Sequence, residues 1–125
     1  LVEKPYIEGK KKSLRLEQAE RIYSTLSEEE KVNAEYFHNM LKAIKHVPID
    51  ITIDENTKID WCEELKIIAT PGHMPGHISI YLEKFKTLIT GDAMVAENGN
   101  LLLANPQFTL DMNEAINSIR KISKL

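Results

Sequence analysis

The sequence contains little cysteine, few aromatic residues and no long apolar run, and each shortage excludes a class of protein. One of the 125 residues is cysteine, Cys62, so the chain can form neither an internal disulfide nor a cysteine-rich zinc site. Such sparse cysteine is typical of a reducing compartment, and we expect a cytoplasmic location. No apolar run approaches the roughly 18 residues that cross a bilayer, so we expect no membrane partner.

The charge of the chain argues against nucleic-acid binding. The net charge is -3, and Lys and Arg form no stripe interleaved with aromatic residues, which make up 6% of the chain. The chain begins L-V-E-K-P-Y, without an initiator methionine and without the basic start and apolar core of a signal peptide. We therefore expect a processed product or a piece of a longer protein.

The first part of the chain, from about Ser13 to His46, has the apolar periodicity of helices. Residues 27–30 spell a capping box, which predicts that one helix ends near Leu26 and that another begins after Ser27. Pro48 closes this helical segment.

After Pro48 the apolar residues alternate, which predicts strands. The first is I-D-I-T-I, residues 49–53, and residues 58–61 form a short return strand after a turn at Asn56 and Thr57. A second clear strand, E-L-K-I-I-A-T, ends at Pro71. The segments H-I-S-I-Y-L-E and K-T-L-I-T then form an antiparallel pair around a short charged turn.

The last third of the chain is expected to be irregular before a closing helix. Residues 94–108 contain N-G-N as turn material and Asn105-Pro106 as a break. The helix begins at the box formed by residues 111–114, and its apolar face comprises Met112, Ala115, Ile116, Ile119 and Ile122. The pattern predicts a single α/β domain over 1–125, with a helical segment (13–46), a β-rich half (49–125) and mostly antiparallel strands.

Two polar residues stand just beyond the ends of apolar strands. His73 follows Pro71-Gly72, which forces the chain out of a strand, and Asp92 follows Gly91. A neutral imidazole and a carboxylate that converge at loop ends suit zinc, iron or manganese. The alternative interpretation is ordinary turn chemistry, in which both side chains only cap the backbone.

The segment T-P-G-H-M-P-G-H-I-S-I-Y, followed by L-I-T-G-D-A, resembles the central part of the metallo-β-lactamase superfamily. The nearest branch contains glyoxalase II-like and lactonase-like hydrolases, and the match is specific over residues 66–93. The resemblance implies part of an αββα sandwich with a dinuclear metal site at the edge of its sheets. It also implies hydrolysis of an ester, thioester, lactone or lactam type bond by metal-activated water, with a small-molecule substrate.

The resemblance assigns roles to individual residues. His73 matches a metal-binding histidine, and Asp92 matches the aspartate that bridges two metals. His77 matches a position that is not a ligand, and we interpret it as a turn-stabilising, hydrogen-bonding imidazole. Ser79 or Thr90 would support the ligand loops. The helical segment would lie over the mouth of the site as a lid.

Two elements of the family pattern have no counterpart in this sequence. The motif H-x-H-x-D-H and the last metal histidine are missing, so only His73 and Asp92 remain as ligands. A catalytic zinc keeps three protein ligands. We therefore expect no intact catalytic set and no activity of this chain alone. Zinc, iron or manganese would serve the complete protein, and whether this chain alone binds any metal is open.

The alternative function is a non-enzymatic interaction or dimerisation module built on the same fold. A half sandwich exposes an apolar sheet face and strand edges, which predicts a homo-oligomer or the exchange of an edge or element with another chain. The apolar residues concerned are Ile78, Ile80, Leu82, Leu88 and Ile89. A third interpretation, a mononuclear metal sensor, would need His38 or His46 from a second copy.

The remaining candidates have structural interpretations first. Cys62 is expected to be a small packing residue, His38 and His46 ordinary helix residues, and Trp61 and Phe37 part of a core or pocket wall. Substrate contacts can be suggested only by nearness to Asp92 in the sequence, for Met94, Asn98, Asn100 and Phe108.

Overall fold

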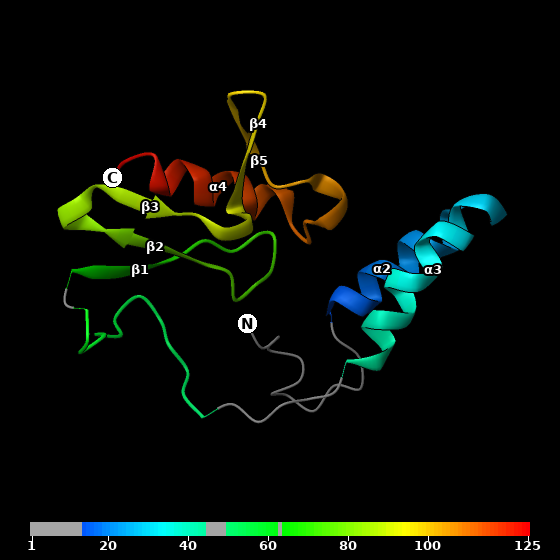
Figure 1. Cartoon of the computed structure of the whole chain (residues 1–125), viewed down its shortest axis with the longest axis horizontal. Coiled ribbons are helices and arrows are strands. Elements are labelled where there is room, and N and C mark those ends of the chain that lie inside the picture. Colours follow the sequence, from blue (N-terminus) through cyan, green and yellow to red (C-terminus); the bar gives the residue numbers. More distant parts are fainter. Residues whose placement is uncertain (1–13, 45–49, 63) are drawn as a thin grey trace. The chain divides into compact units, whose positions relative to one another are not determined.

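The computed structural model describes residues 14–44, 50–62 and 64–125. The chain divides into two compact units at the junction between Ile49 and Asp50 (Figure 1). The α/β class predicted from the sequence is confirmed, with helices first, then antiparallel strands and a closing helix. No helix among the described residues is long and apolar enough to cross a membrane.

The first unit contains two helices, α2 (Leu14–Thr25) and α3 (Glu28–Ala43). The predicted capping box forms: Ser27 Oγ accepts the Glu30 amide at 3.4 Å, and the Glu30 carboxylate accepts the Ser27 amide at 2.9 Å. This reciprocal pairing gives hydrogen-bond partners to backbone amides that a helix start otherwise leaves unpaired. It explains why α3 begins as a separate helix after Ser27. Leu16 and Leu41 are the buried apolar side chains of the pair. The predicted limits at Ser13 and His46 lie outside the described residues.

The second unit is built on an antiparallel sheet in the order β1-β2-β3. Its strands are β1 (Leu65–Ala69), β2 (Ile78–Leu82) and β3 (Thr87–Ile89), and a short turn helix, η1 (Glu83–Phe85), joins the last two. Ile67 lies opposite Ile80, which lies opposite Ile89. These strands and their pairing confirm the sequence prediction for residues 65–89.

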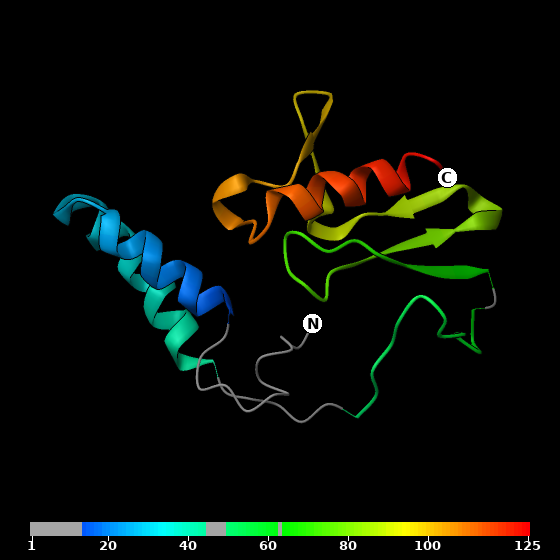
Figure 2. The same cartoon turned by 180° about the vertical axis from the view of Figure 1, so that it is seen from behind.

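The closing helix α4 (Met112–Ile122) lies along this sheet (Figure 2). The Asp111 carboxylate caps it by accepting the Glu114 amide at 3.0 Å. Ala115 and Ile122, from the predicted apolar face, are buried. Ser118 is buried as well, and its hydroxyl donates to the Pro71 carbonyl at 2.7 Å. The helix is therefore fixed to the loop that follows β1.

The strand predicted for residues 49–53 is wrong over the described part, residues 50–53. Ile51 is 79% exposed and Ile53 is 46% exposed. Alternation alone does not make a strand, because the backbone also needs a neighbouring strand to pair with, and no described strand pairs with this segment. The return strand predicted over 58–61 is also wrong: it is loop and turn. The predicted turn before it is present, with the Thr57 amide donating to the Asp54 carbonyl at 3.1 Å.

The segment predicted as irregular, 94–108, instead contains a hairpin that projects from the unit in Figure 1. Its strands are β4 (Met94–Glu97) and β5 (Asn100–Leu103), preceded by η2 (Gly91–Ala93) and followed by η3 (Pro106–Phe108). Asn98 and Gly99 form the turn, both with positive φ, 50° and 78°. Asn-Gly between short apolar runs is a strong hairpin signal, and the sequence prediction used it only as a turn.

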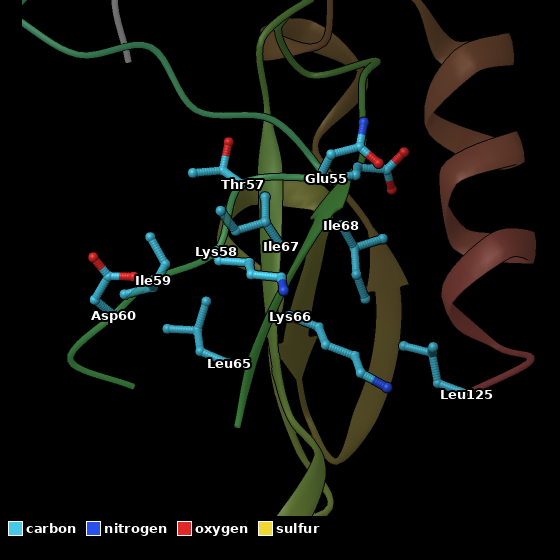
Figure 3. A pocket seen from close by; sticks show the side chains of 11 residues that line it. Glu55, Thr57, Lys58, Ile59, Asp60, Leu65, Lys66, Ile67, Ile68 and Leu125 are labelled. Carbon is cyan, nitrogen blue, oxygen red and sulfur yellow. The ribbon is translucent and has the colours of Figure 1, made fainter. Parts of the chain in front are cut away.

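The loop between residues 55 and 60 and strand β1 enclose a hollow of about 840 Å³ (Figure 3). Its lining combines the apolar side chains of Ile67 and Ile68 with Lys58, Lys66 and Glu55, and the described residues that line it include no histidine or cysteine. Trp61, predicted as core or pocket wall, is 85% exposed, and Phe37 is 40% exposed. Neither ring is therefore buried in a core, contrary to the prediction from the sequence.

Candidate metal centre

The loop between β1 and β2 positions His73 through its backbone. Gly72 has φ 132°, a conformation that only glycine adopts readily, and a Cβ at this position would lie 2.3 Å from the Ala115 amide nitrogen. The Gly72 carbonyl accepts the Asp111 amide at 2.9 Å, and the His73 carbonyl accepts the Leu110 amide at 3.3 Å. The broken P-G-H turn therefore fits closely against the start of α4 and fixes the direction of His73.

Asp92 lies in η2, directly after the end of β3. Its Oδ2 atom is 3.6 Å from Nε2 of His73. The His73 side chain is 16% exposed and that of Asp92 is 73% exposed, so the pair lies at the surface of the unit with one partly buried and one open member. The fold thus brings together the two residues that the sequence predicted as ligands.

The pair has the spacing of two ligands on one metal ion. Donors at 2.0–2.2 Å from a tetrahedral zinc lie about 3.3–3.6 Å from each other, and the distance between His73 and Asp92 matches this range. An imidazole nitrogen and a carboxylate oxygen are also donors that zinc, iron and manganese accept. Within the described ranges, no group of three or more His, Cys, Asp and Glu could hold a metal ion. These two residues therefore fit part of a coordination shell.

His77, from the same loop, is 3% exposed and connects to both sides of the centre. Its Nε2 atom accepts the backbone amide of Asp92 at 3.0 Å. Its Nδ1 atom lies 2.9 Å from Thr70 Oγ1 and 3.1 Å from the Thr70 carbonyl oxygen. Because Nε2 accepts, Nδ1 carries the proton, and the imidazole is neutral. This confirms His77 as a hydrogen-bonding residue of the turn.

The hydrogen bonds continue beyond His77 to the end of β3. Thr70 Oγ1 is 2.9 Å from Ser79 Oγ, which donates to the Thr90 carbonyl at 3.2 Å. Thr70 and Ser79 are each 1% exposed and are the largest fully buried side chains among the described residues. Ser79 therefore links Thr70, after β1, to the carbonyl oxygen of Thr90, after β3. Its support of metal-ligand loops stays a prediction.

Burial lowers the pKa of His77, which outweighs the opposing effects of the Thr70 hydrogen bond and the Asp92 charge. A lowered pKa favours the neutral imidazole that the hydrogen bonds require. His77 therefore keeps an unprotonated Nε2 atom for the Asp92 amide. No signal in the sequence alone marked this link, because the two residues are 15 positions apart and lie on different loops.

The other candidates from the sequence have local surroundings of their own or remain untested. His38 places its ring 4.6 Å from that of Tyr23 within the helical unit, as an ordinary helix residue does. Cys62 is partly buried, consistent with packing. Asn98 and Asn100 belong to the exposed tip of the β4–β5 hairpin, and Phe108 is 42% exposed. Their suggested substrate contacts stay predictions.

Comparison with curated proteins finds similarity to several that are named as metallo-hydrolases or as a hydroxyacylglutathione hydrolase. It is 41% identical over 54 residues to the probable metallo-hydrolase YybB of Bacillus subtilis, covering 43% of this chain and 24% of that protein. It is 31% identical over 84 residues to the probable metallo-hydrolase YflN of the same organism, covering 58% and 32%. A hydroxyacylglutathione hydrolase of Mesorhizobium japonicum is 33% identical over 79 residues, covering 62% and 29%.

These matches confirm the resemblance to the metallo-β-lactamase superfamily that the sequence predicts. The aligned part of the chain spans about a quarter to a third of the length of these three relatives. No family model matches the chain. No solved structure matches it either.

Proposed function

We propose that His73 and Asp92 are two ligands of a divalent-metal centre in a hydrolase of the metallo-β-lactamase superfamily. The observation that carries this proposal is the 3.6 Å separation of His73 Nε2 and Asp92 Oδ2, on loops that are distant in sequence. The relatives support it, because two of those named above are probable metallo-hydrolases and the third is a hydroxyacylglutathione hydrolase. We further propose an ester, thioester, lactone or lactam as the class of bond hydrolysed.

The metal, zinc, iron or manganese, would supply an activated water and polarise the bond under attack. His73 would offer a ring nitrogen as a donor, and the Gly72 turn sets its direction. Asp92 offers a carboxylate that is 73% exposed and thus has room to bridge two ions, the role its position in the family motif implies. The partial burial of His73 limits access of water from one side of the pair, and the exposure of Asp92 would leave the other side open to a substrate.

Two donors do not complete a catalytic site, since a catalytic zinc keeps three protein ligands. The remaining donors would come from outside the described residues or from another chain. We therefore propose that this chain alone is inactive in hydrolysis, and that the activity belongs to the complete protein with a small-molecule substrate. The lid role of the helical segment is part of the same proposal.

The test is a zinc titration of the 125-residue chain by calorimetry, with elemental analysis, beside His73→Ala and Asp92→Asn. We expect each variant to weaken zinc binding about tenfold or more, because each removes one donor. His38→Ala, in the helical unit, is the matched control and should bind as the unmodified chain does. Zinc binding that is equal in all four proteins would overturn the proposed ligands.

A second candidate, an interaction or dimerisation module, is favoured by the β4–β5 hairpin. Its apolar side chains are exposed: Leu101 by 72%, Leu102 by 44% and Val95 by 42%. The groove beside it, about 480 Å³, is lined mainly by apolar residues of the hairpin, β3 and α4. Exposed apolar surface of this kind favours association with another chain, here proposed to be a second copy.

A further inference from the structure

We propose that His77 is a positioning residue that holds Asp92 in the direction required for metal binding. This inference rests on the proposed function for its consequence, because Asp92 is a ligand only if that function is correct. The link itself stands on geometry, since the Asp92 amide donates to His77 Nε2 at 3.0 Å. His77 touches no reacting atom in this scheme and acts through Asp92.

The imidazole is held in one orientation by the groups on its other side. Nδ1–H points to Thr70, with 2.9 Å to Oγ1 and 3.1 Å to the carbonyl oxygen. The Thr70 hydroxyl then donates to Ser79, and Ser79 donates to the Thr90 carbonyl. All donors in this series of hydrogen bonds point the same way, from His77 toward the end of β3. Each hydroxyl proton therefore has one acceptor. Such a buried network, with every polar group paired, resists rotation of the His77 ring.

The backbone around Asp92 is adapted to the same imidazole. Gly91 has φ 54°, and a Cβ at that position would lie 2.9 Å from His77 Nε2. The residue before Asp92 must therefore be small for the ring to reach the Asp92 amide. The network also spans both proposed ligand loops, because Thr70 directly follows β1 on the way to His73, and Thr90 directly follows β3 on the way to Asp92. Holding these two ends together holds the two ligands at a common distance.

Two conservative variants separate positioning from simple packing. His77→Gln can place its side-chain oxygen near the position of Nε2 and so keeps an acceptor for the Asp92 amide. His77→Asn can place its side-chain nitrogen near Nδ1 and so keeps the donor to Thr70 but loses that acceptor. Both variants remove the ring, so a role in packing alone predicts similar effects from the two.

The first readout is amide hydrogen exchange measured by NMR on the whole chain. We expect the Asp92 amide to exchange about 2- to 12-fold faster in His77→Asn, as loss of one hydrogen bond of ordinary strength predicts. In His77→Gln the increase should be smaller. The Thr70 amide, which donates to the His77 backbone carbonyl at 2.9 Å, is the internal control and should keep its protection in both variants.

The second readout is Co²⁺ binding, followed by its visible absorption. We expect His77→Asn to weaken Co²⁺ binding about 10- to 100-fold, the usual loss when a residue that orients a ligand is removed. His77→Gln should lose less. If the unmodified chain binds no Co²⁺, the donors that complete the proposed metal centre lie outside this chain, and Asp92 exchange alone then decides whether His77 holds Asp92. Equal acceleration of the Asp92 and Thr70 amides in both variants would overturn the proposal and leave His77 a packing residue.

Discussion

At the scale of single residues, the two proposed ligands are held by different means. His73 follows a glycine whose missing side chain lets the loop approach Ala115, so backbone contact with α4 sets its direction. Asp92 is held through its own amide by a side chain from the other loop. The first arrangement depends on close packing and the second on a directional hydrogen bond. Substitutions at Gly72, beside Ala115, and at Gly91, beside His77, should therefore have different consequences.

Replacing Gly91 by alanine tests the contact with His77. The positive φ alone costs about 1–2 kcal/mol for a residue with a Cβ, and the added atom would also crowd His77 Nε2 at 2.9 Å. Gly99→Ala is the matched control, because Gly99 has φ 78° and nothing within 4 Å of its Cβ position. We expect Gly91→Ala to lower the free energy of unfolding in urea by more than Gly99→Ala. Equal losses would mean that the ring moves aside without cost.

The sequence predicted His73 and Asp92 because a short motif carries them, each beside a break in a strand. It predicted His77 only as a turn residue, since its partner in the Asp92 loop depends on how β2 and β3 pair. Trp61 was predicted incorrectly for a related reason. An aromatic residue is buried only if another element covers it, and single-sequence patterns do not say which element does.

At the scale of elements, a polar contact ties the loop before β1 to α4. The Glu55 carboxylate accepts the Ala69 amide at 2.9 Å and an ammonium proton of Lys121, which also donates to the Ala69 carbonyl at 3.2 Å. Ala69 is the last residue of β1, so loop, strand end and helix meet at one carboxylate. This contact holds residues near 55 close to the sheet although they form no strand.

The contact at Glu55 should make the free energy of unfolding depend on pH. Its pKa lies below the ordinary value of 4.5, first because of the hydrogen bond from Lys121 and then because of the Ala69 amide. A lowered pKa in the folded state stabilises the fold above the unfolded pKa, and this contribution is lost as pH falls through the folded value. We expect Glu55→Gln to reduce the free energy of unfolding at about pH 6, and to reduce it less near pH 3, below the ordinary pKa of a Glu carboxyl.

Urea unfolding of both proteins at the two pH values measures this difference. Glu64→Gln provides the control, because the Glu64 carboxylate lies 3.0 Å from Lys84 in an exposed ion pair, which contributes little. A Glu55→Gln effect that is the same at both pH values would assign the loss to shape and not to charge.

The elements that the sequence predicted correctly carry their own local signals. The capping box at Ser27 and the Asp111 cap each fix a helix start through nearby atoms, and the pair β2–β3 follows from alternation around a short turn. The strand expected at 49–53 has the right alternation but no partner among the described strands. The hairpin β4–β5 was missed although Asn98-Gly99 signals it, because its strands are only four residues each.

At the scale of the whole chain, the described residues include exposed apolar side chains on the β4–β5 hairpin as well as on α3. Three consecutive leucines of β5 are at least 36% exposed, although alternate strand residues point to opposite faces. Both faces of the hairpin therefore present apolar side chains to solvent, which is costly for a chain that stays alone. Covering this hairpin by a second copy would remove that cost. The hairpin thus adds a second reason to propose a homo-oligomer, which the sequence predicted from the apolar face of β2 and β3.

Sedimentation of the chain over a range of concentrations tests this association. We expect the unmodified chain to self-associate, and Leu101→Lys to shift it toward monomer, because a charge on the hairpin would have to be desolvated at the interface. Val32→Lys is the matched control: Val32 is 72% exposed, as Leu101 is, but belongs to the helical unit. If Val32→Lys disperses the oligomer as strongly as Leu101→Lys, general charge and not the hairpin controls association. A monomer at every concentration would rule out the dimerisation module and leave the proposed metal centre as the function to pursue.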